Sequence, residues 1–180
     1  LYFYGDIVSD RWSAWSDEDQ YPEAIQQLLK GQEGKDLNIY INSGGGDVFA
    51  GMAIYNIIKR HIGFKTVYVD GLAASIASVI AMAGDKLVMP KNAFLMIHKP
   101  WSFVIGNAND MLKEIELLNA IEQSIVNIYA EHLADNVDTE TIAKMVDAET
   151  WLTGEQAAEY FRVDVAAEKQ IAACTSAQFK

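Results

Sequence analysis

The chain has 180 residues, 51% of them apolar, which is enough to bury the core of one domain. It carries 14 Lys and Arg against 25 Asp and Glu, a net charge of −11. An acidic chain has no general attraction for nucleic acid or for an anionic membrane surface, so proteins that bind these by charge alone are excluded. The longest apolar stretch, around 72–84, is too short and too rich in Ala, Gly and Ser for a membrane span.

The first half of the chain alternates strand and helix patterns. We expect strands at 1–8, 37–43, 64–70, 86–90 and 93–98, helices at 22–30, 48–61 and 75–84, and a polar, aromatic loop at 10–21. Pro22 fits the first turn of the first helix, Asp47 can cap the second, and Gly84 closes the third. The alternation predicts one α/β domain over 1–180, built from parallel βαβ units with right-handed crossovers.

The second half is mainly helical. Apolar residues recur every three to four positions through 107–133, which predicts one long amphipathic helix: Met111, Leu112, Ile115, Leu118, Ile121, Ile125 and Ile128. Such a helix spans about 40 Å, more than a domain of this size needs to cover its own sheet. We therefore expect its far end, with the apolar segment 101–105, to pack on another subunit. Helices at 139–146 and 153–160 and a strand near 162–166 follow, and 168–180 shows no clear pattern.

The sequence offers little for metal or cofactor chemistry. The single cysteine, Cys174, cannot form an internal disulfide, which favours a reducing, cytoplasmic compartment. The three histidines, His61, His98 and His132, are far apart and no CxxC occurs, so we expect no metal site and no cofactor. No GxxxxGK[ST] motif is present, so these 180 residues show no ATPase motif.

A candidate nucleophile, Ser75, lies in GLAASIAS (71–78), where a strand and a glycine turn lead into a helix. Free backbone N–H groups and the helix dipole at such a position favour a developing oxyanion. An ordinary helix cap explains the same serine from local sequence. Ser78 is a second candidate, but it lies one turn into the helix, where we expect it to be packed.

The candidate base is His98, which ends the apolar strand of LMIHKP (95–100). Alone, such a histidine is more often a core or edge residue, but imidazole is well suited to take the proton of a serine hydroxyl near neutral pH. Upstream, Gly44–Gly46 follow a buried strand and allow close approach of the backbone to a ligand. We expect Gly46 N–H and Ile76 N–H to donate to an oxyanion, so the three segments together predict serine acyl transfer.

These segments jointly resemble the Clp protease proteolytic subunit family. The matching stretches are INSGGGDVFAGMAIYNII (41–58), GLAASIASVIAMAG (71–84), LMIHKP (95–100), GNANDMLKEIELLN (106–119) and WLTGEQAAEYFRVD (151–164). The resemblance covers about 1–166, with Gly44 where proline is usual and Lys99 where glutamine is usual. It maps the catalytic serine onto Ser75. It implies a crotonase/ClpP-like fold with a protruding handle helix, a Ser-His-Asp triad, peptide or protein substrates, and ring-shaped homo-oligomers that can stack.

The triad acid is the point where the chain departs from the family. A count without gaps from Trp151 places the family's aspartate on Met145, which cannot orient a histidine. Asp147 and Glu149 follow, and we favour Asp147 because a short carboxylate at a helix exit suits a rigid bond to imidazole. The alternative is that Asp147 has no catalytic role and is simply a solvated acid at the end of a helix.

The segment DAETWLT (147–153) is similar to the corresponding segment of Clp-like proteases encoded in phage and prophage head-gene clusters. This resemblance implies that the protein processes phage capsid or scaffold proteins and that no ATPase is obligatory. We therefore predict a serine endopeptidase. Two alternatives remain on the same fold. One is a crotonase-type acyl-CoA enzyme that uses the oxyanion hole without a Ser–His pair, and the other is an inactive assembly protein. Reaction with a fluorophosphonate probe would distinguish the serine endopeptidase from both alternatives.

Overall fold

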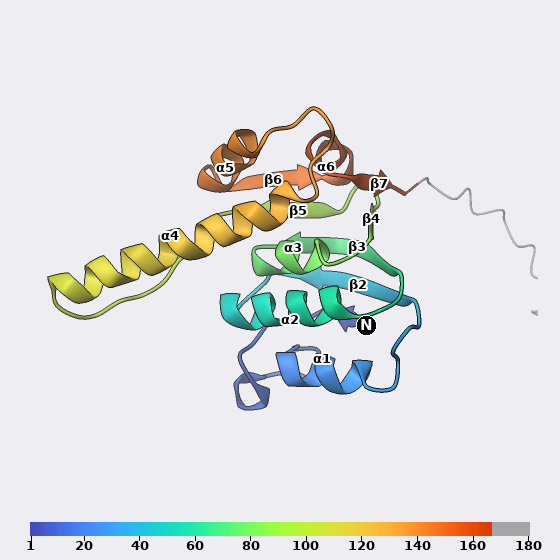
Figure 1. The fold of residues 1–180 in the computed structure, drawn as a ribbon, viewed down its shortest axis with the longest axis horizontal. Coiled ribbons are helices and arrows are strands. Elements are labelled where there is room, and N and C mark those ends of the chain that lie inside the picture. Colours follow the sequence, from blue (N-terminus) through green and yellow to red (C-terminus); the bar gives the residue numbers. More distant parts are fainter. Residues whose placement is uncertain (167–180) are drawn as a thin grey trace, which may run out of the picture.

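The computed structural model describes residues 1–166, so 167–180, with Cys174, lie outside the described residues. Within them a seven-stranded sheet has the order β1-β2-β3-β4-β7, with β5 beside β3 and β6 beside β5 (Figure 1). The strands are β1 (Tyr2–Phe3), β2 (Leu37–Ser43), β3 (Lys65–Ala74), β4 (Lys86–Met89), β5 (Phe94–Ile97), β6 (Thr150–Thr153) and β7 (Val163–Val165). All neighbours are parallel except β5 and β6. The predicted parallel α/β architecture is confirmed.

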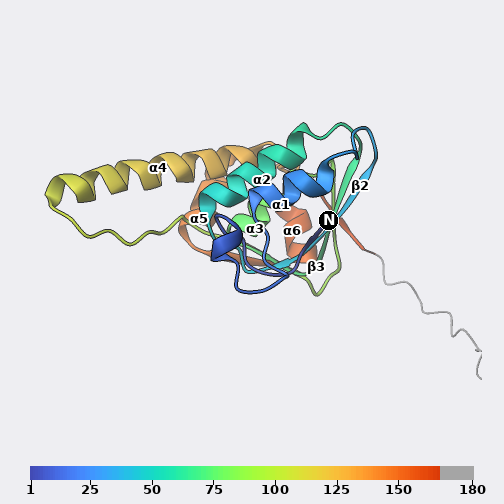
Figure 2. The same ribbon diagram turned by 90° about the horizontal axis from the view of Figure 1, so that it is seen from below.

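The helices connect these strands and cover the sheet. They are α1 (Pro22–Leu29), α2 (Val48–Arg60), α3 (Ile76–Ala81), α4 (Ala108–Ala130), α5 (Thr139–Asp147) and α6 (Gly154–Tyr160), with a short 3-10 turn at Arg11–Ser13. Both views show α1, α2 and α3 close together beside the sheet (Figures 1 and 2). Apolar side chains of β2, β3, α2 and α3 form the fully buried centre of the core: Ile39, Ile41, Val67, Val69, Ile54, Ile58, Ile76 and Ile80.

The predicted elements agree with the structure in most places and differ in four. The strand expected at 1–8 is reduced to Tyr2–Phe3 plus an isolated bridge at Ile7. β3 continues to Ala74, four residues beyond the expected end at 70, and the helix after it covers only 76–81 rather than 75–84. The strand β6 was not predicted, and it pairs antiparallel with β5.

One edge of the sheet gathers the predicted functional segments. β3 pairs with β4 through Thr66–Tyr68 and then with β5 through Leu72–Ala74, so β3 changes neighbour along its length. The carboxyl ends of the parallel strands β2, β3 and β5 therefore meet at the same edge. The glycine run follows β2, Ser75 follows β3 and His98 follows β5.

The helix α4 extends well beyond the body of the protein, as a handle (Figures 1 and 2). Asn107 and Asp110 form a capping box at its first turn, which explains why the helix begins there. Its buried residues are confined to the last two turns, at Ile125, Val126 and Tyr129. Apolar side chains of the first half are open to solvent, among them Leu112 (58% exposed) and Ile115 (53% exposed). None of the helices in residues 1–166 has the length and apolarity to cross a bilayer.

Candidate active site

Ser75 occupies a strained turn between β3 and α3. Its backbone has φ 54° and ψ −131°, a region that a residue with a Cβ rarely adopts. Its N–H donates to Met96 O at 3.0 Å, which fixes the turn against β5. The hydroxyl makes no capping bond to α3, so the reading of Ser75 as an ordinary helix cap is not supported. The Oγ lies instead 2.7 Å from His98 Nε2.

His98 follows β5 directly, and its side chain is 19% exposed. The parallel register pairs Ala74 with Met96, so the strand ends that carry Ser75 and His98 are neighbours joined by backbone hydrogen bonds. The structure therefore brings these two predicted residues together. With Nε2 unprotonated, it accepts the hydrogen bond from the Ser75 hydroxyl, the arrangement needed for a base to activate a nucleophile.

The two acids near His98 lie differently from our expectation. The Asp147 carboxylate is 2.6 Å from Lys99 Nζ and makes no contact with the imidazole. This hydrogen bond is the main cause that raises the pKa of Lys99 above its ordinary value, with Glu122 adding to it. Glu149 has the carboxylate that faces the ring, with Oε2 4.0 Å from His98 Nδ1.

The unpredicted strand β6 explains why Glu149, and not Asp147, faces the imidazole. Ile97 pairs with Thr150 in the antiparallel register, so the next residues along, His98 and Glu149, come opposite one another. Glu149 itself has φ 49°, and this left-handed turn directs the chain from α5 into β6. Asp147 ends α5 before that turn and is held by the lysine that follows the histidine.

The backbone of the glycine run lies so close to Ser75 and Ile7 that Gly45 and Gly46 leave no room for a side chain. A Cβ at Gly45 would lie 2.8 Å from the Ser75 Cβ, and one at Gly46 would lie 2.0 Å from Ile7 O. Ile7 N donates to Gly45 O and Asp47 N donates to Ile7 O, while Gly46 N–H between them has no acceptor within residues 1–166. Ile76 N–H opens α3 and lacks an intrahelical acceptor. Within residues 1–166, neither of the two expected oxyanion donors has a backbone acceptor.

Ser75 and His98 line a cavity of about 280 Å³. Its walls come from the N-terminus of α2, one face of α4 and the segment after His98, and they are lined by Gly46, Asp47, Val48, Phe49, Pro100, Trp101, Ser102, Glu114, Leu117, Leu118 and Ile121. A mainly apolar hollow with few polar groups beside a nucleophile is the usual form of a substrate site.

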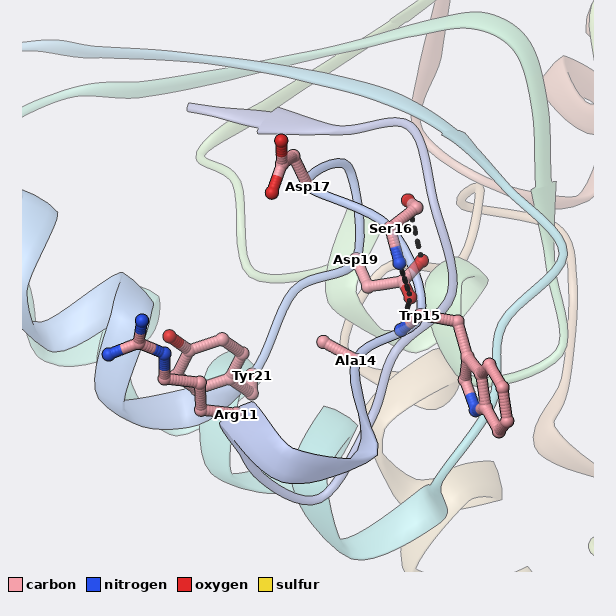
Figure 3. Close-up of a pocket in the computed structure, with 7 residues that line it drawn as sticks. All are labelled: Arg11, Ala14, Trp15, Ser16, Asp17, Asp19 and Tyr21. Carbon is pink, nitrogen blue, oxygen red and sulfur yellow. Dashed lines mark hydrogen bonds between the residues drawn. The ribbon is translucent and has the colours of Figure 1, made fainter.

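A larger cavity, of about 610 Å³, lies in the loop before α1 and lacks such a pair (Figure 3). The Asp19 carboxylate there accepts hydrogen bonds from Trp15 N at 2.8 Å and Ser16 N at 3.0 Å, so it holds the loop backbone together. Its lining residues include Ser16 but no histidine to pair with it, and we assign the reactive site to the smaller cavity.

Ser78, the alternative nucleophile, is fully buried and engaged behind Ser75. Its hydroxyl donates to Ser75 O at 2.5 Å and lies 2.7 Å from Tyr129 OH of α4. Burial raises the pKa of Tyr129 above its ordinary value, so this phenol stays protonated. Sequence patterns predicted that Ser78 would be packed, but they gave no indication of its bond to Tyr129, 51 residues away.

The histidines outside the site do not gather ligands. His61 Nε2 contacts Lys35 O at 2.8 Å, and His132 Nε2 is buried without a hydrogen-bond partner in residues 1–166. Among the described residues there is no group of three or more His, Cys, Asp or Glu side chains arranged to hold a metal ion.

A serine in a strained strand-to-helix turn, a histidine beside it and two backbone N–H groups without acceptors in residues 1–166 form the arrangement of a serine-hydrolase-type site on an α/β sheet. Residues 13–170 match the Clp protease family, and the chain belongs to that family. It is 35% identical over 141 residues to the ATP-dependent Clp protease proteolytic subunit 1 of Streptomyces avermitilis, covering 76% of this chain and 64% of that protein. It is 34% identical over 140 residues to the corresponding subunit of Porphyromonas gingivalis, covering 76% and 61%.

Among solved structures, the chain is similar to a mutant of ClpP1 from Listeria monocytogenes. The TM-score is 0.75 at 24% identity, with 93% of this chain and 91% of that chain covered. The predicted ClpP-like fold is confirmed. The chain spans less than two thirds of the length of the two relatives described above.

Proposed function

We propose that this protein is a serine endopeptidase in which Ser75 is the nucleophile and His98 the general base. The observation that carries the proposal is the 2.7 Å contact between His98 Nε2 and the Oγ of a serine in a strained turn. Strain of this kind persists only where the surroundings enforce it, and it is typical of functional positions. The names of the relatives, proteolytic subunits of Clp proteases, support peptide substrates.

The mechanism follows from the positions of the groups. His98 Nε2 takes the proton as Ser75 Oγ attacks the peptide carbonyl carbon, and the N–H groups of Gly46 and Ile76 hold the oxyanion that forms. The imidazolium then protonates the leaving amine, and the tetrahedral species collapses to an acyl-enzyme. A water molecule, deprotonated by His98, attacks the ester and releases the acid product, which restores the serine.

We propose Glu149, rather than Asp147, as the acid that orients His98. Its register opposite His98 in the β5–β6 pair supports this role, and a modest shortening of the 4.0 Å separation would give a hydrogen bond from Nδ1–H. Catalytic hydrogen bonds are often long in a ligand-free site and tighten when substrate is bound. Asp147 is already committed to Lys99.

The test of the nucleophile is Ser75→Ala. We expect it to abolish both peptide hydrolysis and labelling by a fluorophosphonate probe, with circular dichroism and assembly unchanged because only a hydroxyl is lost. Ser78→Ala is the matched control and should keep labelling at Ser75. Labelling of Ser78 instead of Ser75 would contradict the assignment of the nucleophile. Labelling of neither serine in the parent protein would favour the acyl-CoA or non-enzymatic alternative.

We further propose that the protein works as a ring-like homo-oligomer and that its substrates are proteins of a phage head, such as capsid or scaffold proteins. The exposed apolar first half of α4 supports assembly, because a monomer gains nothing from presenting such a stripe to water. The proposal of phage substrates is supported only by the sequence of the segment DAETWLT (147–153). Incubation of the protein with capsid and scaffold proteins encoded beside its gene tests that part directly.

A further inference from the structure

We propose that the cavity beside Ser75 selects a basic side chain, Lys or Arg, at the residue immediately before the scissile bond, and that Glu114 is the residue that selects it. This inference rests on the proposed peptidase function. It adds the chemical class of the substrate side chain that the site prefers.

One wall of the cavity is a single face of α4. Glu114, Leu117, Leu118 and Ile121 lie three and four residues apart, so they line up along one side of the helix. The three apolar members lie toward the body of the protein, and Glu114 lies one turn further out along the handle. The wall thus presents an apolar stretch that ends in a carboxylate.

Glu114 is half-buried at this wall, and its carboxylate makes no hydrogen bond or ion pair within residues 1–166. The charged residues that line the cavity are Asp47 and Glu114, with His98 at the reactive end and no Lys or Arg among the described lining residues. The Asp47 carboxylate already accepts a hydrogen bond from Ala50 N at 2.7 Å. Glu114 is therefore the acid that has its full hydrogen-bonding capacity left for a ligand.

Lys and Arg match this combination because each has an apolar stem and a cationic end. The stem would pack against Leu117, Leu118 and Ile121, and the head would reach Glu114. Exposed aromatic rings of Phe49 and Trp101 at the rim can also attract a cation. An apolar side chain of the same length fills the same space, but it shields Glu114 from water without pairing it, which is unfavourable. A cavity of about 280 Å³ suits one long side chain rather than a folded segment.

The experiment compares fluorogenic peptides of identical sequence that end in Arg, in its neutral isostere citrulline, or in Leu before the reporter. We expect the parent protein to show a higher kcat/KM for the Arg peptide than for the citrulline peptide. Glu114→Gln should lower that ratio about tenfold, the effect of losing one charge-assisted contact at a partly exposed site. Glu114→Lys should bring the ratio below one. Raised salt should weaken the Arg preference, because charge pairs near the surface are screened.

The matched control is Glu116→Gln, which removes the same charge from an exposed position of α4 that does not line the cavity. It should leave the ratio unchanged. Equal or better cleavage of the Leu and citrulline peptides by the parent protein, with Ser75 still labelled by a fluorophosphonate, would overturn this inference and leave the peptidase proposal standing. Failure of Ser75 to react with the probe and of every peptide to be cleaved would overturn both.

Discussion

Removing the Ser78 hydroxyl should destabilise the protein more than removing the Tyr129 hydroxyl, although the two groups share one hydrogen bond. Ser75 O can only accept, so the single hydroxyl proton of Ser78 is donated to it. Tyr129 must then be the donor to Ser78 Oγ in the 2.7 Å contact. Because the hydrogen bonds run in this direction, removal of the Ser78 hydroxyl and removal of the Tyr129 hydroxyl should lower the stability by different amounts.

Tyr129→Phe removes one hydrogen bond and leaves Ser78 still bonded to Ser75 O. Its expected effect on the free energy of unfolding is a loss of about 0.5–1.5 kcal/mol, the net contribution of one internal hydrogen bond. Ser78→Ala removes both bonds and leaves the fully buried Tyr129 hydroxyl without an acceptor. An unsatisfied buried group alone costs about 1–3 kcal/mol, so the total loss should be about 2–4 kcal/mol.

Urea unfolding followed by tryptophan fluorescence measures both losses. The protein concentration must be the same for all variants, because assembly contributes to apparent stability. Equal m-values would show that the midpoints report stability and not a change in the unfolded state. A Tyr129→Phe loss equal to or larger than the Ser78→Ala loss would refute the reasoning. Ser75 should stay reactive in both variants, because the backbone bond from Ser78 N to Ser75 O at 3.0 Å involves neither altered side chain.

Three further predictions concern the acid, the pH dependence of stability and assembly. Glu149→Gln should lower kcat by up to about 10⁴, the effect of replacing a triad acid by an amide, and Asp147→Asn should lower it less than about tenfold; the reverse ranking would return the role to Asp147. Burial is the main cause that lowers the pKa of His132 from 6.5 to about 4, so the unfolded chain binds that proton first. Stability should then be complete above about pH 6.5 and fall toward pH 4, and His132→Gln should flatten this slope in unfolding curves; an unchanged slope would contradict the burial argument. Ile115→Asp should disperse the oligomer in light scattering while Lys113→Asp should not, and a fully active monomeric parent protein would show that the exposed stripe is not an interface.

Local patterns were sufficient where a segment's neighbours in sequence decide its structure. β2 was predicted with its bounds because LNIYINS is a β-branched run closed by glycines. The helices α1 and α2 were predicted within one residue at each end because Pro22 and Asp47 mark their starts. The pairing of Ser75 with His98 followed from residue chemistry and chain order, and the 2.7 Å contact agrees with it.

The missing parts depend on contacts between distant segments. β6 is four residues long, and the strand it pairs with in residues 1–166 is β5, more than 50 positions earlier, so no local pattern reveals it. Without β6, the register that places Glu149 opposite His98 cannot be derived, and side-chain length and the position at a helix exit favour Asp147 instead. The strain at Ser75 was also invisible, because a positive φ at a serine is imposed by packing and not by its own preference.

The change of neighbour along β3 has a consequence for the motions of the site. Ser75 N–H is bonded to Met96 O between two buried strand ends, so this amide should exchange with solvent deuterium only through large-scale opening of the sheet. The cavity wall on α4 belongs to a helix whose fully buried side chains all lie in its last two turns. In one chain, we therefore expect slow exchange at the Ser75 amide and faster exchange in the first half of α4. If neighbouring subunits cover that half, their dissociation should weaken the proposed substrate selection before it disturbs the Ser75–His98 pair.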